Sequence, residues 1–343
     1  MDAMIQSVMR IFSGIQPSGN LHIGNYLGSI LQWVELLENS PNTEGIFCIV
    51  DLHTITVKQD PKVLKEKIYE LAAIYLAAGI DYKRNIIFAQ SQNPDHTYCA
   101  WLFNCITPIG WLNRMTQFKD KRAKLENYGN IVSTGLLTYP SLMAADILLY
   151  DTDIVPVGGD QAQHVELTRS IGQRFNRLYG RTFKIPTVKV NEITAYIMDL
   201  QEPTKKMSKS DTNPKGKINL LATEKEILDN IKKAVTDTDN SVRYDVRNKA
   251  GISNLIVILS SIEKISIQEI EAKYSSSSYS TFKNDVANSV LEFLLPLQKK
   301  TKEYLSDKAE LERILRLGTE KSYKISHPKL LEVCNKMGLF YNE

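Results

Sequence analysis

Apolar runs alternate with helical patterns between residues 11 and 92, and this alternation restricts the fold more than any other feature. Residues 45–51 are apolar up to a final acid, and residues 85–89 form a second such run, as expected of parallel strands covered on both faces. Between them, residues 62–79 carry apolar side chains at helical spacing. The pattern predicts an α/β fold with a doubly wound, Rossmann-like parallel sheet, whose ligands bind beyond the carboxyl ends of the strands.

The first apolar run, at residues 11–12, ends in a turn of glycines and a proline and continues as an amphipathic helix from about Ile23. A strand that enters a helix through such a turn brings backbone N–H groups and the positive end of the helix dipole together, where a phosphate can sit. The turn has neither common phosphate-loop spacing. It offers Gly24, which permits close approach of a ligand, and the polar side chains of His22 and Asn25. Taken alone, it fits a structural turn better than a binding site.

A basic loop lies far downstream, where K-M-S-K-S occupies residues 206–210 within PTKKMSKSDTNPKG. The surrounding proline, glycine, serine and asparagine residues indicate a loop rather than a helix or strand. A lysine run is by itself usually a solvated face. However, H-I-G-N at residues 22–25 followed by K-M-S-K-S is the paired signature of class I aminoacyl-tRNA synthetases. The chain resembles the bacterial-type tryptophanyl-tRNA synthetases along nearly its whole length.

Composition adds only broad limits. A chain of 343 residues is long enough for two domains, and a net charge of +3 permits RNA contact through local patches without requiring it. The four cysteines form no C-x-x-C pair and have no histidines at zinc spacing, so they read as mostly buried, reduced thiols, with no metal site. Neither a signal peptide nor an apolar run of membrane-spanning length is visible, which favours a cytoplasmic protein with no membrane partner.

The pattern changes to helices only near Lys215, where we place a domain boundary. Residues 9–214 are then the Rossmann-like catalytic domain, with an apolar helical insertion at about 95–135, and residues 215–343 are a helical domain. Within the insertion, residues 119–130 read as a basic, polar loop. Capping boxes are expected at residues 223–226 and 266–269, and Pro296 is expected to kink or end a long helix.

Residues 137–150 form the most informative helical pattern, because they are apolar nearly all round past Ser141 except for Asp146. Tyr139, Met143 and Asp146 share one face at positions i, i+4 and i+7. A buried carboxylate is costly unless something donates to it. The donor is either an internal partner, such as a lysine or a backbone amide, or an N–H group of a ligand. An aromatic ring, a thioether and one acceptor on one face suit a flat ring with a donor at its edge, such as indole.

Residues 154–157 form a short strand that enters a glycine turn at Gly158 and Gly159, followed by Asp160. An acid at this position suits a ribose or an amino group, since it would repel a triphosphate. His164, in the helix that follows, is either a ligand contact or, more commonly at such positions, a histidine satisfied within the protein.

The resemblance implies activation of L-tryptophan by ATP, with Mg²⁺ arriving on the nucleotide, and transfer to the 2′-hydroxyl of the terminal adenosine of tRNA(Trp). It also implies a homodimer formed through the helical insertion, and an anticodon-binding role for the helical domain. In such a reaction the protein contributes mainly by aligning the reactants and by stabilising the charge that develops on the phosphates. Mobile lysines suit that role, and the candidates are Lys206, Lys209 and Lys121, with His22 and Asn25 beside them.

Further site residues are carried over from the family where the motifs match. ATP would contact the first turn, the 158–160 turn and the lysine loop, through Gln16, Pro17, Ser18, Gly24, Asn25, Gly158, Gly159, Asp160, Ile197, Lys206, Met207, Ser208, Lys209 and Ser210. Asp146 would accept from the indole N–H, and the α-ammonium and ring would be held by Tyr139, Gln161, Met143, Phe12, Gly14, His53, Val155 and Val157. Two positions depart from the family pattern, as Asn25 replaces the usual histidine and Gly159 stands where many members carry an acid.

Two other readings are compatible with these motifs. A tyrosyl enzyme of the same class would want polar groups at the far edge of the ring, whereas Tyr139, Met143 and Asp146 favour tryptophan. A catalytically silent RNA- or nucleotide-binding relative would not need His22 or the lysines of the basic loop. Pyrophosphate exchange with each amino acid distinguishes all three.

Overall fold

A computed structural model describes residues 8–127, 131–190, 197–209, 211 and 213–340. These residues form two compact units. Unit 1 takes its residues from 1–17, 33–190 and 304–343, and unit 2 from 18–32 and 191–303. The units differ from two consecutive domains that meet near Lys215, because residues 18–32 belong to unit 2 and residues 304–343 belong to unit 1. The segment after the first strand pairs with residues 218–220, and the C-terminal helix packs on the sheet.

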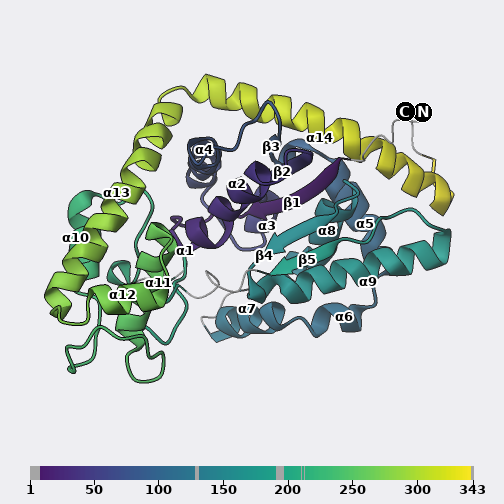
Figure 1. The fold of residues 1–343 in the computed structure, drawn as a ribbon. Helices are drawn as coiled ribbons and strands as arrows, with labels where there is room; N and C mark the ends of the chain where they lie inside the picture. Colours follow the sequence, from purple (N-terminus) through teal and green to yellow (C-terminus); the bar gives the residue numbers. More distant parts are fainter. Residues whose placement is uncertain (1–7, 128–130, 191–196, 210, 212, 341–343) are drawn as a thin grey trace, which may run out of the picture. The chain divides into compact units, whose positions relative to one another are not determined.

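Unit 1 is built on the predicted parallel sheet (Figure 1). The strands, all parallel, are β1 (Met9–Ile15), β2 (Thr43–Ile49), β3 (Ile86–Ala89), β4 (Ile154–Val157) and β5 (Thr187–Val190). Their order, β3-β2-β1-β4-β5, reverses direction between β1 and β4. This arrangement confirms the doubly wound fold and puts the expected ligand crevice beyond the carboxyl ends of β1 and β4.

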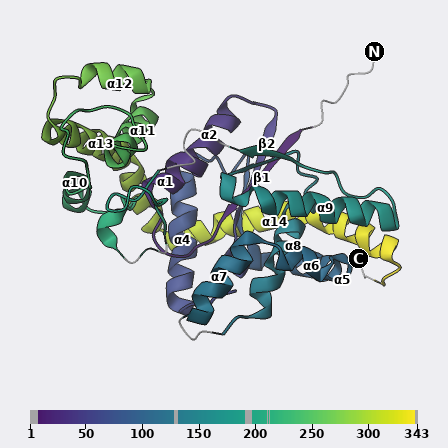
Figure 2. The same ribbon diagram turned by 90° about the horizontal axis from the view of Figure 1, so that it is seen from below.

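Helices cover both faces of this sheet in the two views (Figures 1 and 2). Asp60 explains why one of them starts where it does, because its side chain accepts hydrogen bonds from the first free backbone N–H groups of α4. The helices assigned wholly or mainly to unit 1 are α2 (Leu31–Glu38), α3 (Asp51–Thr54), α4 (Pro61–Ala77), α5 (Asp95–Ile106), α6 (Ile109–Asn113), α7 (Thr116–Asn127), α8 (Thr134–Leu148), α9 (Ala162–Tyr179) and α14 (Lys308–Met337).

Helix α7 corrects one expectation, since residues 119–127 are helical and not part of a loop. Their charged residues are good helix formers, with neither glycine nor proline before residue 129. Arg122 and Glu126 also form an i, i+4 ion pair along the helix at 2.8 Å. Lys121 therefore projects from a helix rather than from a loop.

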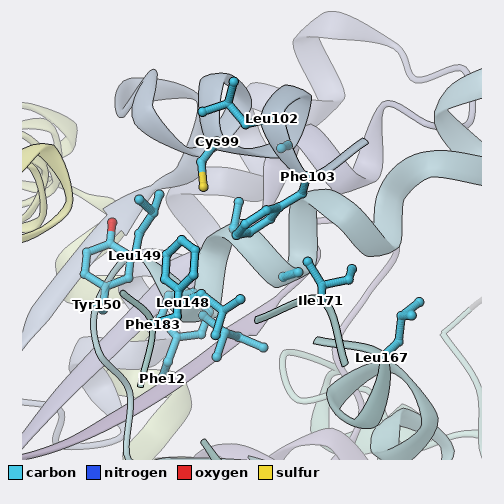
Figure 3. Close-up of a cluster of buried hydrophobic side chains, with 14 of the residues drawn as sticks. Phe12, Cys99, Leu102, Phe103, Leu148, Leu149, Tyr150, Leu167, Ile171 and Phe183 are labelled. Carbon is cyan, nitrogen blue, oxygen red and sulfur yellow. The ribbon is translucent and has the colours of Figure 1, made fainter. Parts of the chain in front are cut away.

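The core of unit 1 lies where α5, α8 and α9 meet the sheet (Figure 3). Phe12 of β1 stacks on Tyr150, with ring centroids 5.7 Å apart, and the hydroxyl of Tyr150 points away from Phe12 in Figure 3. Three of the four cysteines, Cys48, Cys99 and Cys334, are buried free thiols, as predicted, and Cys105 is exposed. Burial raises the pKa of the Cys48 and Cys99 thiols.

Helix α14 packs on β3 at a glycine. A Cβ added to Gly318 would lie 1.8 Å from the carbonyl oxygen of Ile87, so no larger residue fits without moving the helix. We expect Gly318→Ala to lower the free energy of unfolding by about 3 kcal/mol, in the range of severe overpacking. Urea denaturation measures it. Gly110→Ala is the control, since a Cβ there meets no described atom within 4 Å; equal losses in both variants would contradict this packing.

Unit 2 begins with α1 (Ile23–Asn25), which continues into a π-helical turn (Tyr26–Ile30). Its other described helices are α10 (Glu224–Lys232), α11 (Ala250–Glu263), α12 (Ile267–Lys273) and α13 (Tyr279–Leu305), the last two residues of which fall in unit 1. Both capping boxes are present, at Thr223 and Ser266. Pro296 does not end α13, which continues to Leu305. No single helix in the described part of the chain is long and apolar enough to cross a membrane, although α11 and α12, which meet at 108°, pass that test as a pair.

Candidate active site

Asp146, on α8, is the centre of a buried polar cluster in unit 1. It is 1% exposed and holds three side-chain donors. His53 Nε2 lies 2.7 Å from its Oδ2, while Gln90 Nε2 and His96 Nδ1 each lie 2.6 Å from its Oδ1. His53 follows β2, and Gln90 and His96 follow β3. The cluster therefore assembles at the carboxyl ends of adjacent parallel strands, where the fold predicts ligands.

The donors keep Asp146 ionised. Burial opposes the charged form, but the electrostatic attraction of His53 and the hydrogen bonds from His53 and His96 outweigh it and lower the pKa of Asp146 to about 2. An ionised carboxylate only accepts hydrogen bonds and has about four lone-pair positions. Oδ1 receives two of the three donors and Oδ2 receives one. With respect to the described residues, Oδ2 therefore retains one acceptor position for a further N–H group.

Sequence reasoning anticipated an internal partner for Asp146 but named the wrong kinds, since the donors are two imidazoles and a side-chain amide rather than a lysine or backbone amide. It placed His53 in the site and put the end of the 85–89 strand, where Gln90 lies, at the ligand edge of the sheet, but it omitted His96. The position of Gln90 directly after β3 was the available signal. Gln90 Oε1 is also buried without a hydrogen-bond partner among the described residues, so it is a second acceptor close to Asp146.

Tyr139, about two helical turns before Asp146 on α8, belongs to the same cluster. The edge of its ring meets His53, with centroids 6.1 Å apart, and its hydroxyl hydrogen-bonds to His164 Nε2. His164 therefore has a partner within the protein at Nε2, in line with the more common of the two readings. Lys121 lies over the Tyr139 ring, 5.4 Å from its centroid, and burial lowers the pKa of Lys121. The structure thereby brings Lys121 to a residue predicted to hold the amino acid.

The remaining predicted residues of unit 1 line the same part of the sheet. Phe12 and Val155 are buried in β1 and β4, and Met143 and Val157 pack against the core beside them. Gly14 is in β1, with Gln16 and Pro17 after it. Gly158 accepts a hydrogen bond from the backbone N–H of Gln161, closing the turn after β4. A Cβ on Gly159 would meet no described atom within 4 Å, and the Asp160 side chain is outside the described part.

Unit 2 brings the two signature motifs together, although they are far apart in the sequence. Gly19 has a φ of +63°, and a Cβ on it would lie 3.2 Å from the carbonyl oxygen of Lys209, so the first turn packs directly on the lysine loop. Backbone hydrogen bonds hold this arrangement, from Ile23 N–H to Ile218 O and from Leu220 N–H to Leu21 O, both at 2.8 Å. The two motifs therefore lie side by side in unit 2.

His22 is buried at the centre of this site. Burial, followed by the charges of Lys209, Lys217 and Lys206, lowers the pKa of His22 to about 3, so the imidazole is neutral at physiological pH. Its Nδ1 has no hydrogen-bond partner among the described residues. Lysines gathered around a neutral hydrogen-bonding ring repel one another unless an anion lies between them. The site is therefore suited to a polyphosphate.

Other predicted residues of unit 2 have structural contacts. Asn25 Oδ1 accepts the backbone N–H of His22 at 3.2 Å and caps the helix, consistent with a milder role than a catalytic histidine. Met207 is buried and its N–H donates to Ile197 O at 3.0 Å, which anchors the loop. Gly24 and Ser208 lie on the two motifs themselves, Ser18 lies in the turn before the first motif, and Ser210 lies outside the described residues.

Lys217 is a residue that sequence reasoning missed. Its Nζ donates to the carbonyl oxygens of Asp211, at 2.7 Å, and Lys209, at 3.3 Å, and so anchors the backbone of the lysine loop. The signal was only its proximity in sequence to the loop.

The Lys209 ammonium gives a pH prediction. Burial lowers the pKa of Lys209 to about 8. The protonated form is the one that attracts phosphate, so kcat/KM for ATP should fall as the pH rises through about 8. Lys209→Arg should move this alkaline limb up by at least one pH unit, because arginine stays protonated. Pyrophosphate exchange from pH 6.5 to 10 measures both profiles; an alkaline limb that does not move would exclude Lys209 as its source.

Comparison with known proteins agrees with this geometry. The family model of tRNA synthetases class I (W and Y) matches residues 4–295. The tryptophan–tRNA ligase of Clostridium tetani is 48% identical over 328 residues, covering 96% of this chain and 95% of that protein. That of Bacillus subtilis is 48% identical over 329 residues, covering 96% and 97%.

Solved structures give the same result. The tryptophanyl-tRNA synthetase of Mycoplasma pneumoniae superposes with a TM-score of 0.89 at 35% identity, covering 97% of this chain and 98% of that one. The Campylobacter jejuni enzyme, complexed with ADP and tryptophan, superposes with a TM-score of 0.81 at 35% identity, covering 96% and 100%. A tyrosyl-tRNA synthetase from Aeropyrum pernix, at 20% identity and a TM-score of 0.68, shares the fold.

Proposed function

The chain belongs to the class I tRNA synthetases of the tryptophan and tyrosine type, and from this premise we propose that it is a tryptophan–tRNA ligase. It activates L-tryptophan with ATP and transfers it to the 2′-hydroxyl of the terminal adenosine of tRNA(Trp). One observation carries the choice of amino acid: the ionised Asp146 retains an acceptor position inside an apolar helix wall. Indole has one N–H donor at the edge of a flat apolar ring and matches that site. Phenylalanine would leave the acceptor unpaired, which is strongly disfavoured.

The first reaction is a displacement at phosphorus. A carboxylate oxygen of tryptophan bonds to the α-phosphorus of ATP as the bond to the β-phosphate oxygen breaks, and pyrophosphate leaves with the electron pair. Lys206 and Lys209 stabilise the charge that grows on the pyrophosphate, with Lys121 as a further candidate. Neutral His22 contributes a hydrogen bond and no charge. The ribose and adenine are held by Gly158, Gly159, Asp160 and Ile197, and Mg²⁺ accompanies the phosphates.

Amino-acid recognition is assigned to unit 1. Asp146 accepts from the indole N–H, while Tyr139 and Gln161 hold the α-ammonium group. The hydroxyl of Tyr139 is oriented by His164, and the ring is enclosed by Phe12, His53, Met143, Val155 and Val157. In the second reaction the tRNA hydroxyl attacks the carbonyl carbon of the adenylate, and AMP leaves.

The macromolecular partners are tRNA(Trp) and a second copy of the chain. The helical segment after residue 215 is assigned to the anticodon, and the exposed Lys299, Lys300, Lys302 and Arg316 are its basic groups. Arg313 is less available, because it pairs with Glu310 at 2.6 Å. For the homodimer, Trp101 and Ile109 in the 95–135 insertion are 67% and 66% exposed, unlike the core residues beside them. The proposed location is the cytoplasm.

Pyrophosphate exchange tests this function. Purified protein with ATP, Mg²⁺ and labelled pyrophosphate should exchange with tryptophan at least about a thousandfold faster than with tyrosine or phenylalanine. Acylation of tRNA transcripts should then require tRNA(Trp). Faster exchange with tyrosine would establish the tyrosyl reading, and RNA binding without exchange by any amino acid would establish a silent binding protein.

A further inference from the structure

A buried chain of hydrogen bonds leads from Asp146 to the C-terminal helix α14, entirely within unit 1. His96 bonds to Asp146 through Nδ1, and its Nε2 lies 2.7 Å from the hydroxyl oxygen of Tyr150. Asn93 Nδ2 lies 3.3 Å from the same hydroxyl and 3.1 and 3.0 Å from the Oγ atoms of Ser322 and Ser326 on α14. All of these side chains are buried.

The polar atoms fix the direction of some of these bonds. Ser326 Oγ donates its proton to Asp95 Oδ2 at 2.5 Å, and Ser322 Oγ donates to the carbonyl oxygen of Thr319 at 2.8 Å. The NH₂ group of Asn93 has two hydrogens and faces three oxygens, of which those of the two serines are nearer than that of Tyr150. Asn93 Oδ1 is turned the other way and accepts the backbone N–H of Asp95 at 3.2 Å.

The direction at His96 follows from Asp146. An ionised carboxylate only accepts hydrogen bonds, so His96 donates to Asp146 Oδ1 through Nδ1–H. A neutral imidazole with its proton on Nδ1 accepts at Nε2, so the Tyr150 hydroxyl donates to His96. Such outer partners commonly fix the tautomer and orientation of a functional histidine.

We propose that α14 anchors His96 at the amino-acid site through Asn93 and Tyr150, and that these three side chains act as positioning residues for indole recognition. The Tyr150 hydroxyl, donating to His96 Nε2, holds the imidazole with its Nδ1–H on Asp146 Oδ1, which leaves the second acceptor position on Oδ2 for the indole N–H. This inference deepens the proposed function, since it takes Asp146 as the indole acceptor. In this proposal Asn93, Tyr150 and His96 do not contact the substrate; they act on it only through Asp146.

The cleanest variant is Tyr150→Phe, which removes the central hydroxyl and keeps the ring that stacks on Phe12. The substrates compared are tryptophan and its benzothiophene isostere, in which sulfur replaces the N–H group. Loss of one link should lower kcat/KM for tryptophan by about tenfold, the effect of one hydrogen bond. The isostere, which has no N–H to place, should change less than about twofold. The ratio of kcat/KM for tryptophan to kcat/KM for the isostere should therefore fall by about fivefold or more.

A second variant tests the anchor on α14. Ser322→Ala combined with Ser326→Ala should lower the same ratio, whereas Thr319→Val is the matched control. Thr319 is on the same helix, and its hydroxyl donates to Gln92 Oε1 at 2.8 Å, outside the chain. The chain has only five histidines, so ¹⁵N spectra of histidine-labelled protein resolve the His96 tautomer directly. The wild type should show Nδ1–H, and the double variant a mixture of tautomers.

The outcomes separate this inference from the function on which it depends. The inference is supported if the ratio of kcat/KM for tryptophan to that for the isostere falls in Tyr150→Phe and in the double serine variant but not in Thr319→Val. If the wild type discriminates between the two substrates and these two variants lose activity on both substrates equally, the inference is overturned and the function stands. An Nε2–H tautomer of His96 in the wild type overturns it likewise. A wild type that activates no tryptophan, or fails to discriminate, overturns the assignment of Asp146 itself.

Discussion

Replacing Asp146 with asparagine should lower kcat/KM for tryptophan in pyrophosphate exchange by about a thousandfold or more, as expected of a site built around one hydrogen bond to its substrate. Asparagine keeps the size of the side chain but removes the charge. It also puts an NH₂ group where His53, Gln90 and His96 now donate, so at least one buried donor loses its acceptor. The dissociation constant for ATP, measured by calorimetry without tryptophan, should change less than about threefold.

Asp153→Asn is the matched control for that variant. Asp153 precedes β4, at the amino end of the sheet, where its carboxylate pairs with Lys184 at 2.5 Å and accepts the backbone N–H of Arg10 at 2.9 Å. It is a hydrogen-bonded acid remote in the topology from the ligand end of the strands. Its replacement should reduce stability without changing the KM for tryptophan. An Asp146→Asn enzyme that lost ATP and tryptophan binding equally would show that Asp146 is structural.

Replacing Lys206 with alanine should reduce the rate of exchange by about a hundredfold or more, the usual cost of removing one donor aimed at developing charge. The reason is the clustering of Lys206 with Lys209 and Lys217 around the buried, neutral His22. Because the charge on pyrophosphate grows in the transition state, the loss should appear mainly in kcat and only weakly in the KM for ATP.

The neighbouring Lys205 provides the control. Its ammonium pairs with Glu202, and its side chain is 65% exposed, so it is a surface lysine of the same loop. Lys205→Ala should leave kcat within about twofold of wild type. A similar loss in both variants would mean that the loop acts through its general positive charge and that Lys206 has no special position.

The sheet was predictable because its strands are buried on both faces and read as unbroken apolar runs, as β2 and β3 show. One element was mispredicted, since the charged residues 119–127 form a helix where their polarity suggested a loop. Pro296 does not end α13. The pairing of residues 21–23 with 218–220 could not be predicted, because local periodicity carries no sign of a contact between segments so far apart in sequence.

The residues of the candidate site were likewise predictable only in part. Asp146, Tyr139 and His53 were identifiable, since one face of a helix or the end of a strand presents each of them. His96 and Tyr150 were not assigned, because a polar residue in or after a helix gives no sign of which distant group it meets. The same holds for Asn93 and the serines of α14, which meet across more than 200 positions of sequence.

A crystal structure of the full chain with tryptophan and a non-hydrolysable ATP analogue tests the central claim most directly. The account predicts the indole nitrogen at about 2.9 Å from Asp146 Oδ2, with the three present donors to Asp146 retained and the phosphates of the analogue among His22, Lys206 and Lys209. An indole nitrogen bonded elsewhere, with the free position of Asp146 filled by a group of the protein and no phosphate near those lysines, would contradict it.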